Sequence, residues 1–344
     1  MPQPKTELAY YSFNHALSHN ATINMVIGGR GLGKTYGAKK KAIKDFIKNG
    51  AMHIYMRRFE TEMFAKENYF DDLIVREEFP EWDFRVHGKV GQIAPKSTRD
   101  EKKRVWQTLV WFIPLSRAQH YKGVPFPRVT LIIFDEFLIE KSHMQYLPNE
   151  YEAFINFYST VDRWDDRVRV VMLANSVSIM NPYFLRFNIT PKVGDELLTF
   201  ANGFVLLHMP ESKKFSDAVM QTKFGQFIAE TDYADYAVGN AFSDNAGTML
   251  KMKTGNARYQ YTLETKTITF SVWLDVFTNR WYVQTKLPKK QRKFTIVPSR
   301  VNEENLLVLH NDRVLQMLRT SFRMARVWFD TPATRNAFLD VFKR

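Results

Sequence analysis

A glycine-rich segment, residues 28–35, has the composition of a loop that binds a phosphate chain. It places Gly28, Gly33, Lys34 and Thr35 at the spacing of the phosphate-binding loop pattern. The glycines let backbone N–H groups close around an anion, the lysine reaches the β and γ phosphates, and the threonine hydroxyl holds Mg²⁺. We predict that a nucleoside triphosphate and Mg²⁺ bind to Gly28, Gly29, Arg30, Gly31, Leu32, Gly33, Lys34 and Thr35.

Two acids interrupt the apolar run Val129–Ile139 (VTLIIFDEFLI), which predicts a buried strand. Asp135 is expected to hold Mg²⁺ through its water shell, and Glu136 to orient and deprotonate an attacking water. A protein that only binds nucleotide does not need the second acid, so the pair indicates hydrolysis. The alternative is a pair of surface acids at the end of a strand, which the phosphate-binding loop upstream disfavours.

Polar residues also end the next apolar run, Val168–Ala174, where Asn175 and Ser176 follow the last apolar residue. These side chains either contact the γ-phosphate or the attacking water, or they cap the helix that follows. The sequence leaves both alternatives open for Asn175.

Phosphoryl transfer requires positive charge near the transition state, and arginine usually supplies it. The candidates outside the glycine-rich segment are Arg163, Arg167, Arg169 and Lys122. Arg169 falls within an apolar strand pattern, so we interpret it as structural. Arg30 lies inside the glycine-rich segment and is placed to contact phosphate or a neighbouring subunit.

Strands that alternate with helices must position these residues. Ile23–Gly28 predicts a buried strand, and the residues from Lys34 to about Gly50 predict a helix, a context that disfavours a chance glycine-rich turn. Further predicted elements are the strands Met52–Arg58, Arg85–Lys96 and Arg104–Pro114, a mixed helical stretch Phe59–Phe79, a loop Ser116–Pro127 and a helix Pro148–Val161. Because the buried strands are apolar throughout, we predict an α/β fold with a mostly parallel sheet covered on both faces.

After about Leu207 the apolar strand patterns give way to a polar stretch, and this change predicts a second, smaller α+β domain. We place the domains at residues 1–207 and 231–344, and we interpret 208–230 as a polar linker or lid with a weak helical signal. The predicted second domain has a meander of strands at Tyr259–Glu264, Thr267–Phe277 and Trp281–Lys286, and a helix at Val314–Phe329.

Basic residues outnumber acidic ones, 49 to 36, and the resulting net charge of +13 favours a polyanionic partner such as nucleic acid. The candidates for sequence-independent phosphate contacts are Lys286, Lys289, Lys290, Arg292, Lys293, Arg319, Arg323 and Arg326. A solvated basic face is the alternative. The chain has no cysteine, which fits a reducing cytoplasm, and we expect no secretory signal and no membrane partner.

Several of these segments together resemble the DNA packaging ATPases of phi29-like bacteriophages. They are GGRGLGKT, LIIFDEF, the spacing to VVMLANSVSIMNPYF and the small basic C-terminal domain. The similarity covers most of the chain, strongly in the N-terminal half and weakly in the C-terminal half. The stretch from Asp162 through Tyr183 is more specific than the phosphate-binding loop, which thousands of unrelated proteins share.

The resemblance implies an ASCE-type ATPase domain that uses ATP and Mg²⁺, followed by a vestigial nuclease domain of RNase H-like fold. It implies a homopentameric ring on the portal (connector) protein of an empty prohead, with double-stranded DNA and a packaging RNA as further partners. The protein is then expected in the host cytoplasm, transiently docked on the prohead, and not in the mature virion.

By position, the resemblance assigns the roles described above to Lys34, Thr35, Asp135 and Glu136. Arg163 matches an arginine that acts in trans on the nucleotide of a neighbouring subunit, and Lys122 matches a second trans-acting basic residue. The residues after Arg163, Trp164-Asp165-Asp166, are more acidic than expected, which keeps Arg167 open as the trans-acting group.

Nuclease activity is not expected of the second domain. RNase H-like nucleases hold two Mg²⁺ with clustered carboxylates. Tyr259–Leu263 carries no acid, and Asp275 stands nearly alone in the predicted meander.

We therefore predict an ATP-driven translocase of double-stranded DNA that packages a phage genome. Two alternatives remain on sequence alone. A helicase or recombination motor of another family would separate DNA strands. A nucleotide-gated, nucleic-acid-binding assembly protein would bind ATP but turn it over negligibly.

Overall fold

The chain divides into two compact units in a computed structural model, which describes residues 10–139, 146–175, 181–187, 189, 191, 195–210, 213–228, 252–266, 268–309, 312–323, 326–331, 334–335, 338 and 341. Unit 1 comprises Met1–Val177 and Val193–Ala241, and unit 2 comprises Ser178–Lys192 and Phe242–Arg344. The predicted boundaries at 207 and 231 differ from this division, because the segment 178–192 groups with unit 2 and the segment 208–230 groups with unit 1.

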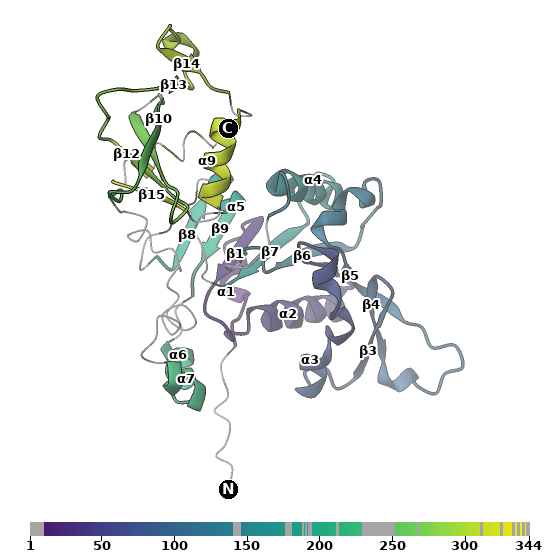
Figure 1. The fold of residues 1–344 in the computed structure, drawn as a ribbon. Helices are drawn as coiled ribbons and strands as arrows, with labels where there is room; N and C mark the ends of the chain where they lie inside the picture. Colours follow the sequence, from purple (N-terminus) through teal and green to yellow (C-terminus); the bar gives the residue numbers. More distant parts are fainter. Residues whose placement is uncertain are drawn as a thin grey trace. The chain divides into compact units, whose positions relative to one another are not determined.

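Unit 1 is built on a sheet with the strand order β3-β4-β5-β2-β6-β7-β1-β9-β8 (Figure 1). Its strands are β1 Ile23–Ile27, β2 Met52–Met56, β3 Trp82–His87, β4 Val90–Pro95, β5 Gln107–Phe112, β6 Val129–Asp135, β7 Arg169–Ala174, β8 Leu197–Phe200 and β9 Val205–His208. The six neighbouring strands from β5 to β9 in this order pair in parallel, and the antiparallel pairs lie at the two edges. The predicted α/β fold with a mostly parallel sheet is confirmed.

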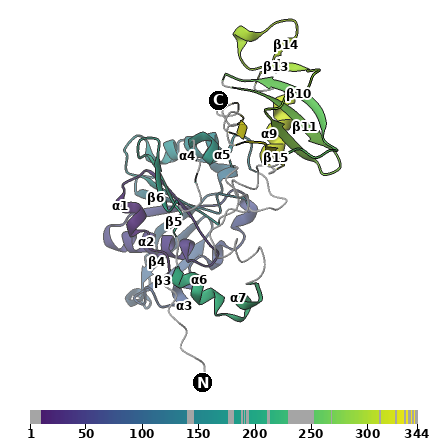
Figure 2. The ribbon, with the colours of Figure 1, turned by 90° about the vertical axis from the view of Figure 1, so that its left-hand side faces the viewer.

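Helices cover both faces of this sheet. The helices of unit 1 are α1 Asn14–Ser18, α2 Lys34–Asn49, α3 Asp71–Val75, α4 Glu150–Asp162, α6 Lys213–Met220 and α7 Lys223–Ile228. Ile133 belongs to the core cluster that contains α2 residues, whereas the next residue, Phe134, stacks on Phe154 of α4. Successive strand residues point to opposite faces, so α2 and α4 lie on opposite sides of the sheet, as Figures 1 and 2 show.

Three predictions for unit 1 are corrected by the structure. The segment Arg85–Lys96 is not one strand, because Gly88 turns the chain with φ 59° and makes β3 and β4 a hairpin. The stretch Phe59–Phe79 forms three short helices, at Glu60–Met63, Lys66–Asn68 and α3, rather than one. The predicted loop contains a 3₁₀ helix, Leu115–Tyr121, whose Leu115 and Ala118 are buried.

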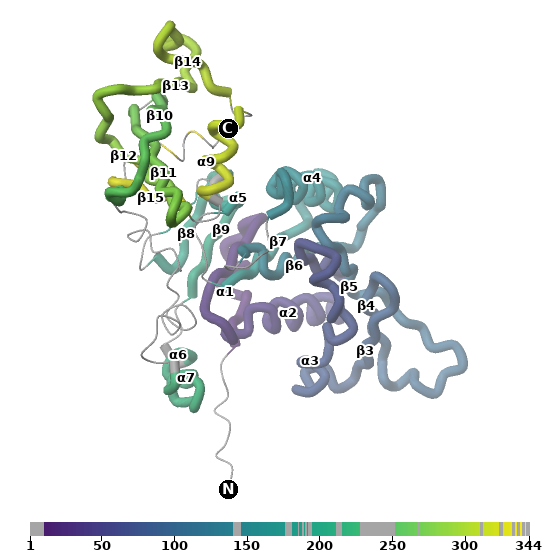
Figure 3. Tube along the Cα trace, viewed as in Figure 1, coloured from purple at the N-terminus to yellow at the C-terminus, as the bar shows by residue number. Residues whose placement is uncertain are grey.

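Unit 2 is a six-stranded sheet with the order β14-β13-β10-β11-β12-β15. Its described elements are β10 Arg258–Glu264, β11 Thr269–Asp275, β12 Arg280–Gln284, β13 Lys293–Thr295, β14 Asn305–Leu307, β15 Val327–Phe329, α5 Pro182–Phe187, a 3₁₀ helix Pro298–Arg300 and α9 Arg313–Arg323. The predicted meander β10-β11-β12 is confirmed as antiparallel. Strands β13 and β14 then add in parallel beside β10, and Figure 3 traces this path.

The last predicted helix ends earlier than expected. Its predicted apolar stripe is confirmed at Leu315, Leu318 and Phe322, which are buried in the unit 2 core. However, α9 ends at Arg323, and Val327–Phe329 pairs in parallel with β12. Valine and aromatic residues favour an edge strand over the end of a helix. Arg326 therefore lies outside the helix on which it was predicted.

No described helix of either unit is long and apolar enough to span a membrane.

Candidate active site

The loop predicted to bind phosphate joins β1 to α2, and the predicted strand and helix on either side of it are confirmed. Gly31 and Gly33 have φ values of 80° and 79°, the left-handed region that glycine adopts without strain. A Cβ at Gly33 would lie 2.3 Å from the Tyr10 ring, so the N-terminal segment packs directly on the loop. The Leu32 side chain is buried in the core, which leaves only its backbone to contact a ligand.

Lys34 is buried within this loop. Its Nζ donates to the carbonyl oxygens of Gly28 and Gly29, both at 2.8 Å, and to Asn175 Oδ1 at 3.3 Å. Burial lowers the pKa of Lys34 to about 8, Asp135 opposes this shift, and Arg30 adds to it. A buried cation whose hydrogen bonds go to neutral oxygens is a suitable partner for an entering phosphate chain.

Thr35 and Asp135 come together beneath the loop. The Thr35 hydroxyl donates to Asp135 Oδ1 at 3.0 Å, and the Glu136 backbone N–H donates to the same oxygen at 3.2 Å. Tyr55, the penultimate residue of β2, donates its hydroxyl to Asp135 Oδ2 at 2.8 Å. A hydroxyl and a carboxylate are oxygen ligands that suit Mg²⁺, so these residues fit the metal that the sequence predicts here. Sequence reasoning missed Tyr55, because a tyrosine in an apolar run carries no separate signal.

Glu136 is held by an arginine that sequence reasoning also missed. Arg57 Nη2 lies 2.6 Å from Glu136 Oε2, and Arg57 Nη1 lies 3.9 Å from Asp135 Oδ2. Glu136 has a φ of 53°, an uncommon conformation for a residue with a side chain. The ion pair engages Oε2 of a side chain that is more than half exposed, so water can still approach this carboxylate. The sequence places Arg57 at the end of the predicted strand Met52–Arg58, and the pairing of this strand with β6 is known only from the structure.

The next residue, Arg58, is fully buried and holds the backbone beside Glu136. Its guanidinium makes two hydrogen bonds to the Glu150 carboxylate, at 2.7 and 3.0 Å, and donates to the carbonyl oxygens of Glu136 and Phe137 at 3.3 and 2.5 Å. Glu150 begins α4, so this buried ion pair joins the ends of β2 and β6 to the start of that helix.

The C-terminal end of α4 carries Arg163. Its Nη2 lies 3.4 Å from the carbonyl oxygen of Gly123, which places it beside the predicted partner Lys122, and both side chains are exposed. Arg163 and Lys122 precede β7 and β6, whereas the phosphate-binding loop follows β1. These strands are parallel, so the two basic residues lie at the amino ends of the strands, whereas the loop of their own chain lies at the carboxyl ends.

The other arginines near this end are engaged within their own chain. Arg167 is partly buried and donates to the carbonyl oxygens of Val161, at 2.6 Å, and Val129. Arg169 donates to Asn20 Oδ1 at 3.1 Å, in line with the structural role predicted for it. Ser176 lies outside the described residues.

A polar cavity of about 500 Å³ lies over β10, β13 and β14 in unit 2. Its central acid, Glu264, binds Arg300 Nη1 at 3.0 Å and Asn305 Nδ2 at 2.6 Å. Asp275 instead accepts hydrogen bonds from Thr254, Phe277 and Thr278 at the end of β11. Among the described residues, no group of three or more His, Asp or Glu side chains is placed to hold a metal ion.

The predicted nucleic-acid-binding residues of unit 2 differ in their exposure. The exposed ones are Lys286, Lys289, Lys290, Arg292 and Arg326, and the partly buried ones are Lys293 and Arg319. The Arg323 side chain lies outside the described set.

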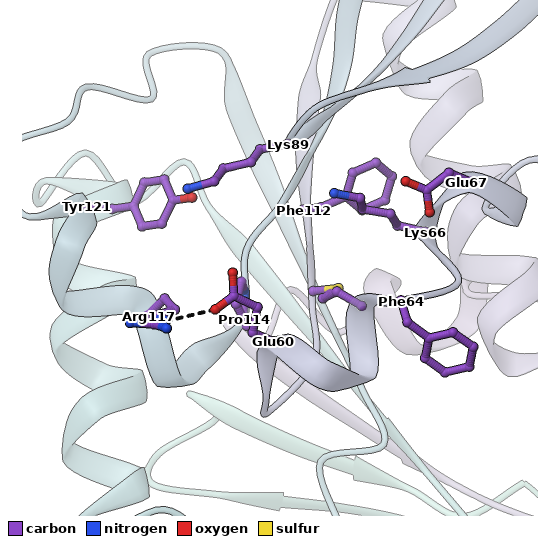
Figure 4. Close-up of a pocket in the computed structure, with 10 residues that line it drawn as sticks. Glu60, Phe64, Lys66, Glu67, Lys89, Phe112, Pro114, Arg117 and Tyr121 are labelled. Atoms are coloured by element: carbon purple, nitrogen blue, oxygen red, sulfur yellow. Dashed lines mark hydrogen bonds and ion pairs between the residues drawn. The ribbon is translucent and has the colours of Figure 1, made fainter.

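A second cavity, in unit 1, is separate from the phosphate-binding loop. It has a volume of about 330 Å³ and lies where β5 ends (Figure 4). Glu60 and Arg117 pair across it at 2.9 Å, and Lys66, Lys89 and Tyr121 line it. None of the predicted nucleotide or metal ligands lines this cavity.

A parallel α/β sheet with a glycine-rich loop between β1 and α2, and an acidic pair at the end of β6, defines the class: a phosphate-loop α/β protein. The model of the podovirus DNA encapsidation protein (Gp16) family matches residues 6–344. The chain belongs to this family.

Similar proteins agree with this assignment. The DNA packaging protein of Bacillus phage B103 is 33% identical over 331 residues, which cover 95% of this chain and 98% of the relative. The chain is similar to a chain of the bacteriophage Phi-29 viral genome packaging motor assembly, with 32% identity, a TM-score of 0.61, and coverage of 97% and 98%. The N-terminal domain of the DNA packaging ATPase from bacteriophage phi29 is 38% identical with a TM-score of 0.53, covering 60% of this chain and 98% of that domain.

Proposed function

We propose that this protein is the ATP-driven motor that translocates double-stranded DNA into the prohead of a phage. The single observation that carries the proposal is that Thr35, Asp135 and Glu136 are joined by hydrogen bonds, with Lys34 close enough to Asp135 for its pKa to be affected, in a member of the DNA encapsidation family. ATP supplies the phosphoryl group, and Mg²⁺ neutralises its charge when bound. Thr35 and Asp135 would hold the metal, Lys34 the phosphate chain, and Glu136 the attacking water.

The strand order supports an ASCE-type ATPase domain. Strand β7 lies between β1, which precedes the phosphate-binding loop, and β6, which carries the acids. This insertion brings Asn175, at the end of β7, between Lys34 and the acidic pair. The 3.3 Å contact between Asn175 and Lys34 favours the interpretation that Asn175 senses the γ-phosphate over a role in capping.

Arg163 is proposed to complete the site of a neighbouring subunit. Its position at the amino ends of the parallel strands separates it from its own loop, so in a ring it would be available to the loop of another copy. Hydrolysis would then depend on contact between subunits, with Lys122 beside Arg163 as a second cation.

Unit 2 is proposed to be a vestigial nuclease of RNase H-like fold that contacts nucleic acid without cutting it. An antiparallel meander followed by two parallel strands beside its first strand supports this interpretation. Glu264 is occupied by Arg300 and Asn305 rather than grouped with other acids. The exposed Lys286, Lys289 and Lys290 would bind phosphate groups.

The similarity to a chain of the Phi-29 viral genome packaging motor assembly supports a place in a genome-packaging assembly, and we propose its partners on that basis. These partners are double-stranded DNA, the portal protein of the prohead, a packaging RNA and further copies of this chain, in a homopentameric ring. We place the protein in the host cytoplasm, docked on the prohead during packaging and absent from the mature virion.

The test compares DNA-stimulated ATP hydrolysis by the wild type and by Glu136→Gln, with ATP binding measured in parallel. Glu136→Gln should bind ATP with the Kd of the wild type and lose at least about 10²-fold in turnover, because the base is removed while the metal ligands remain. Wild-type turnover in Glu136→Gln would refute the proposed site. Strand separation in an unwinding assay would instead indicate a helicase.

A further inference from the structure

The turn that follows α4 displays a tryptophan on the surface of unit 1. Trp164 is 92% exposed and directly follows Arg163. Both residues, with Asp166, have positive φ values of 54°, 67° and 51°. Such conformations are disfavoured for residues with side chains and persist only where the surroundings fix them.

Asp162 fixes this turn. Its buried carboxylate accepts three backbone hydrogen bonds, from Asp166 at 3.1 Å, Arg167 at 3.0 Å and Val168 at 2.9 Å. These hydrogen bonds fix the conformation of the turn, and the exposed position of Trp164 follows from that conformation. Rigidly displayed tryptophan and arginine side chains are the residue types that most often dominate the binding energy of protein interfaces.

A second exposed aromatic surface belongs to the helix pair α6–α7. Phe224 and Phe227 of α7 are 59% and 79% exposed, and their rings stack with centroids 6.5 Å apart. Gly225 lets α7 approach α6 closely, since a Cβ there would lie 2.0 Å from the carbonyl oxygen of Val219. The two phenylalanines are thus fixed to the surface of α6.

The α6–α7 pair is anchored at the phosphate-binding loop. Phe215 of α6 is buried in the core beside Leu32, and a Cβ at Gly31 would lie 3.3 Å from its ring. Trp164 therefore directly follows the arginine expected to act in trans, and the two phenylalanines belong to a helix pair whose Phe215 contacts the loop on which that arginine is expected to act. In Figures 1 and 2 alike, α4 and the α6–α7 pair lie at opposite ends of unit 1, so one copy does not bring the two surfaces together.

Charges that can pair with each other lie beside the two surfaces, although each surface carries both signs, because Arg163 and Asp217 of α6 are exposed as well. Asp165 and Asp166 are exposed next to Trp164, and Lys223 is exposed next to Phe224. The two acids also face Arg167 and Arg169 of their own chain, at 3.4 and 3.3 Å, but exposed pairs of this kind are weak and leave the carboxylates accessible.

We propose that Trp164 of one copy packs against the Phe224–Phe227 surface of the next copy, and that this contact brings Arg163 to the neighbour's phosphate-binding loop. The partner is a second copy of this chain, because only a second copy offers an aromatic surface anchored at the loop that Arg163 is to reach. The inference rests on the proposed ring ATPase and specifies the contact that aligns its subunits.

The first test measures specific ATPase activity of the full-length chain against protein concentration, in the presence of DNA. Trp164→Ala should raise the concentration for half-maximal activity at least about 10-fold, as expected for an interface hot spot, and should keep the maximal turnover because Arg163 remains. Trp164→Phe should restore part of the shift. Phe277→Ala, which changes a residue that is 82% exposed between β11 and β12, is the matched control and should behave as wild type. An unchanged half-maximal concentration in Trp164→Ala would overturn the proposal.

The second test uses the absence of native cysteine, because any disulfide must then join introduced residues. The double variant Trp164→Cys/Phe227→Cys should form a ladder of covalent multimers on mild oxidation during ATP hydrolysis. A mixture of the two single variants should form dimers only, and Trp164→Cys/Phe277→Cys should form no ladder. Concentration-dependent hydrolysis by the wild type without a 164–227 ladder would refute this contact and leave the ring ATPase standing. Absence of wild-type hydrolysis at every concentration would refute the proposed function itself.

Discussion

At the scale of single residues, the ordinary chemistry of Lys34 is altered by its burial. It donates to two carbonyl oxygens and one amide oxygen, and burial lowers its pKa to about 8. A bound triphosphate would raise that pKa, because a nearby anion favours the charged form. The protonated form is therefore the one that binds nucleotide.

This difference predicts the pH dependence of nucleotide affinity. ATP affinity should be constant below pH 8, the approximate pKa of Lys34 without nucleotide. Above that pH the affinity should fall, by up to about tenfold per pH unit, until the pH exceeds the higher pKa that Lys34 has with ATP bound. The measurement is the ATP Kd by calorimetry from about pH 7 to 9.5. Lys34→Arg, which stays charged throughout, is the control and should give a flat profile. A wild-type Kd that does not change over this range would contradict the role of Lys34.

At the scale of elements, the pair Arg58–Glu150 joins three segments that the sequence separates widely. It holds the ends of β2 and β6 against the start of α4, the helix that bears Arg163 at its other end. Breaking a buried ion pair leaves one charge without compensation. The same helix therefore connects the backbone beside Glu136 with the surface that is proposed to contact a neighbour.

Glu150→Ala should accordingly destabilise unit 1 by about 3–5 kcal/mol. Chemical denaturation should show a lower midpoint with an unchanged slope. Asn156→Ala, which changes an exposed residue of the same helix, is the control and should cost well under about 1 kcal/mol. Equal stability of Glu150→Ala and wild type would show that the pair does not bind these elements together.

Much of this organisation could be predicted from local pattern, and the remainder depends on contacts between distant segments. The loop at Gly28–Thr35 and the acids at Asp135 and Glu136 follow from residue type, spacing and the apolar runs before them. Tyr55 and Arg57 could not be found this way, since they reach the site only because β2 pairs with β6. Similarly, Val327–Phe329 continues a helical pattern in sequence, but an available edge at β12 makes it a strand.

At the scale of the whole molecule, the net charge of +13 should show itself in DNA binding. Affinity for unrelated duplexes should be similar and should fall about 10³- to 10⁵-fold between about 50 and 200 mM salt, if about six to ten phosphates are contacted. The combined change of Lys286, Lys289 and Lys290 to Ala should reduce the salt slope by about 3, and Leu287→Ala should leave it unchanged. A strong preference for one sequence would contradict phosphate-directed binding.

The full chain should not cleave DNA with Mg²⁺ or Mn²⁺. Glu264 is paired with Arg300 and Asn305, and Asp275 accepts three hydrogen bonds at a turn, so neither is grouped for two-metal chemistry. The assay is incubation of supercoiled and linear DNA with each metal, followed by electrophoresis. Metal-dependent cleavage that disappears in Asp275→Ala or Glu264→Ala would overturn the vestigial assignment.

The most direct test of the account concerns catalysis shared between subunits. Arg163→Ala and Glu136→Gln should each bind ATP and lose most turnover, because each lacks one group needed for hydrolysis. Mixed in one ring, they should recover partial activity, since a Glu136→Gln subunit still donates Arg163 to a neighbour that retains Glu136. If Arg163 served its own site, every subunit in the mixture would lack one essential group. Recovery that peaks at intermediate mixing ratios is the predicted result, and no recovery at any ratio in rings shown to form would contradict the trans role of Arg163.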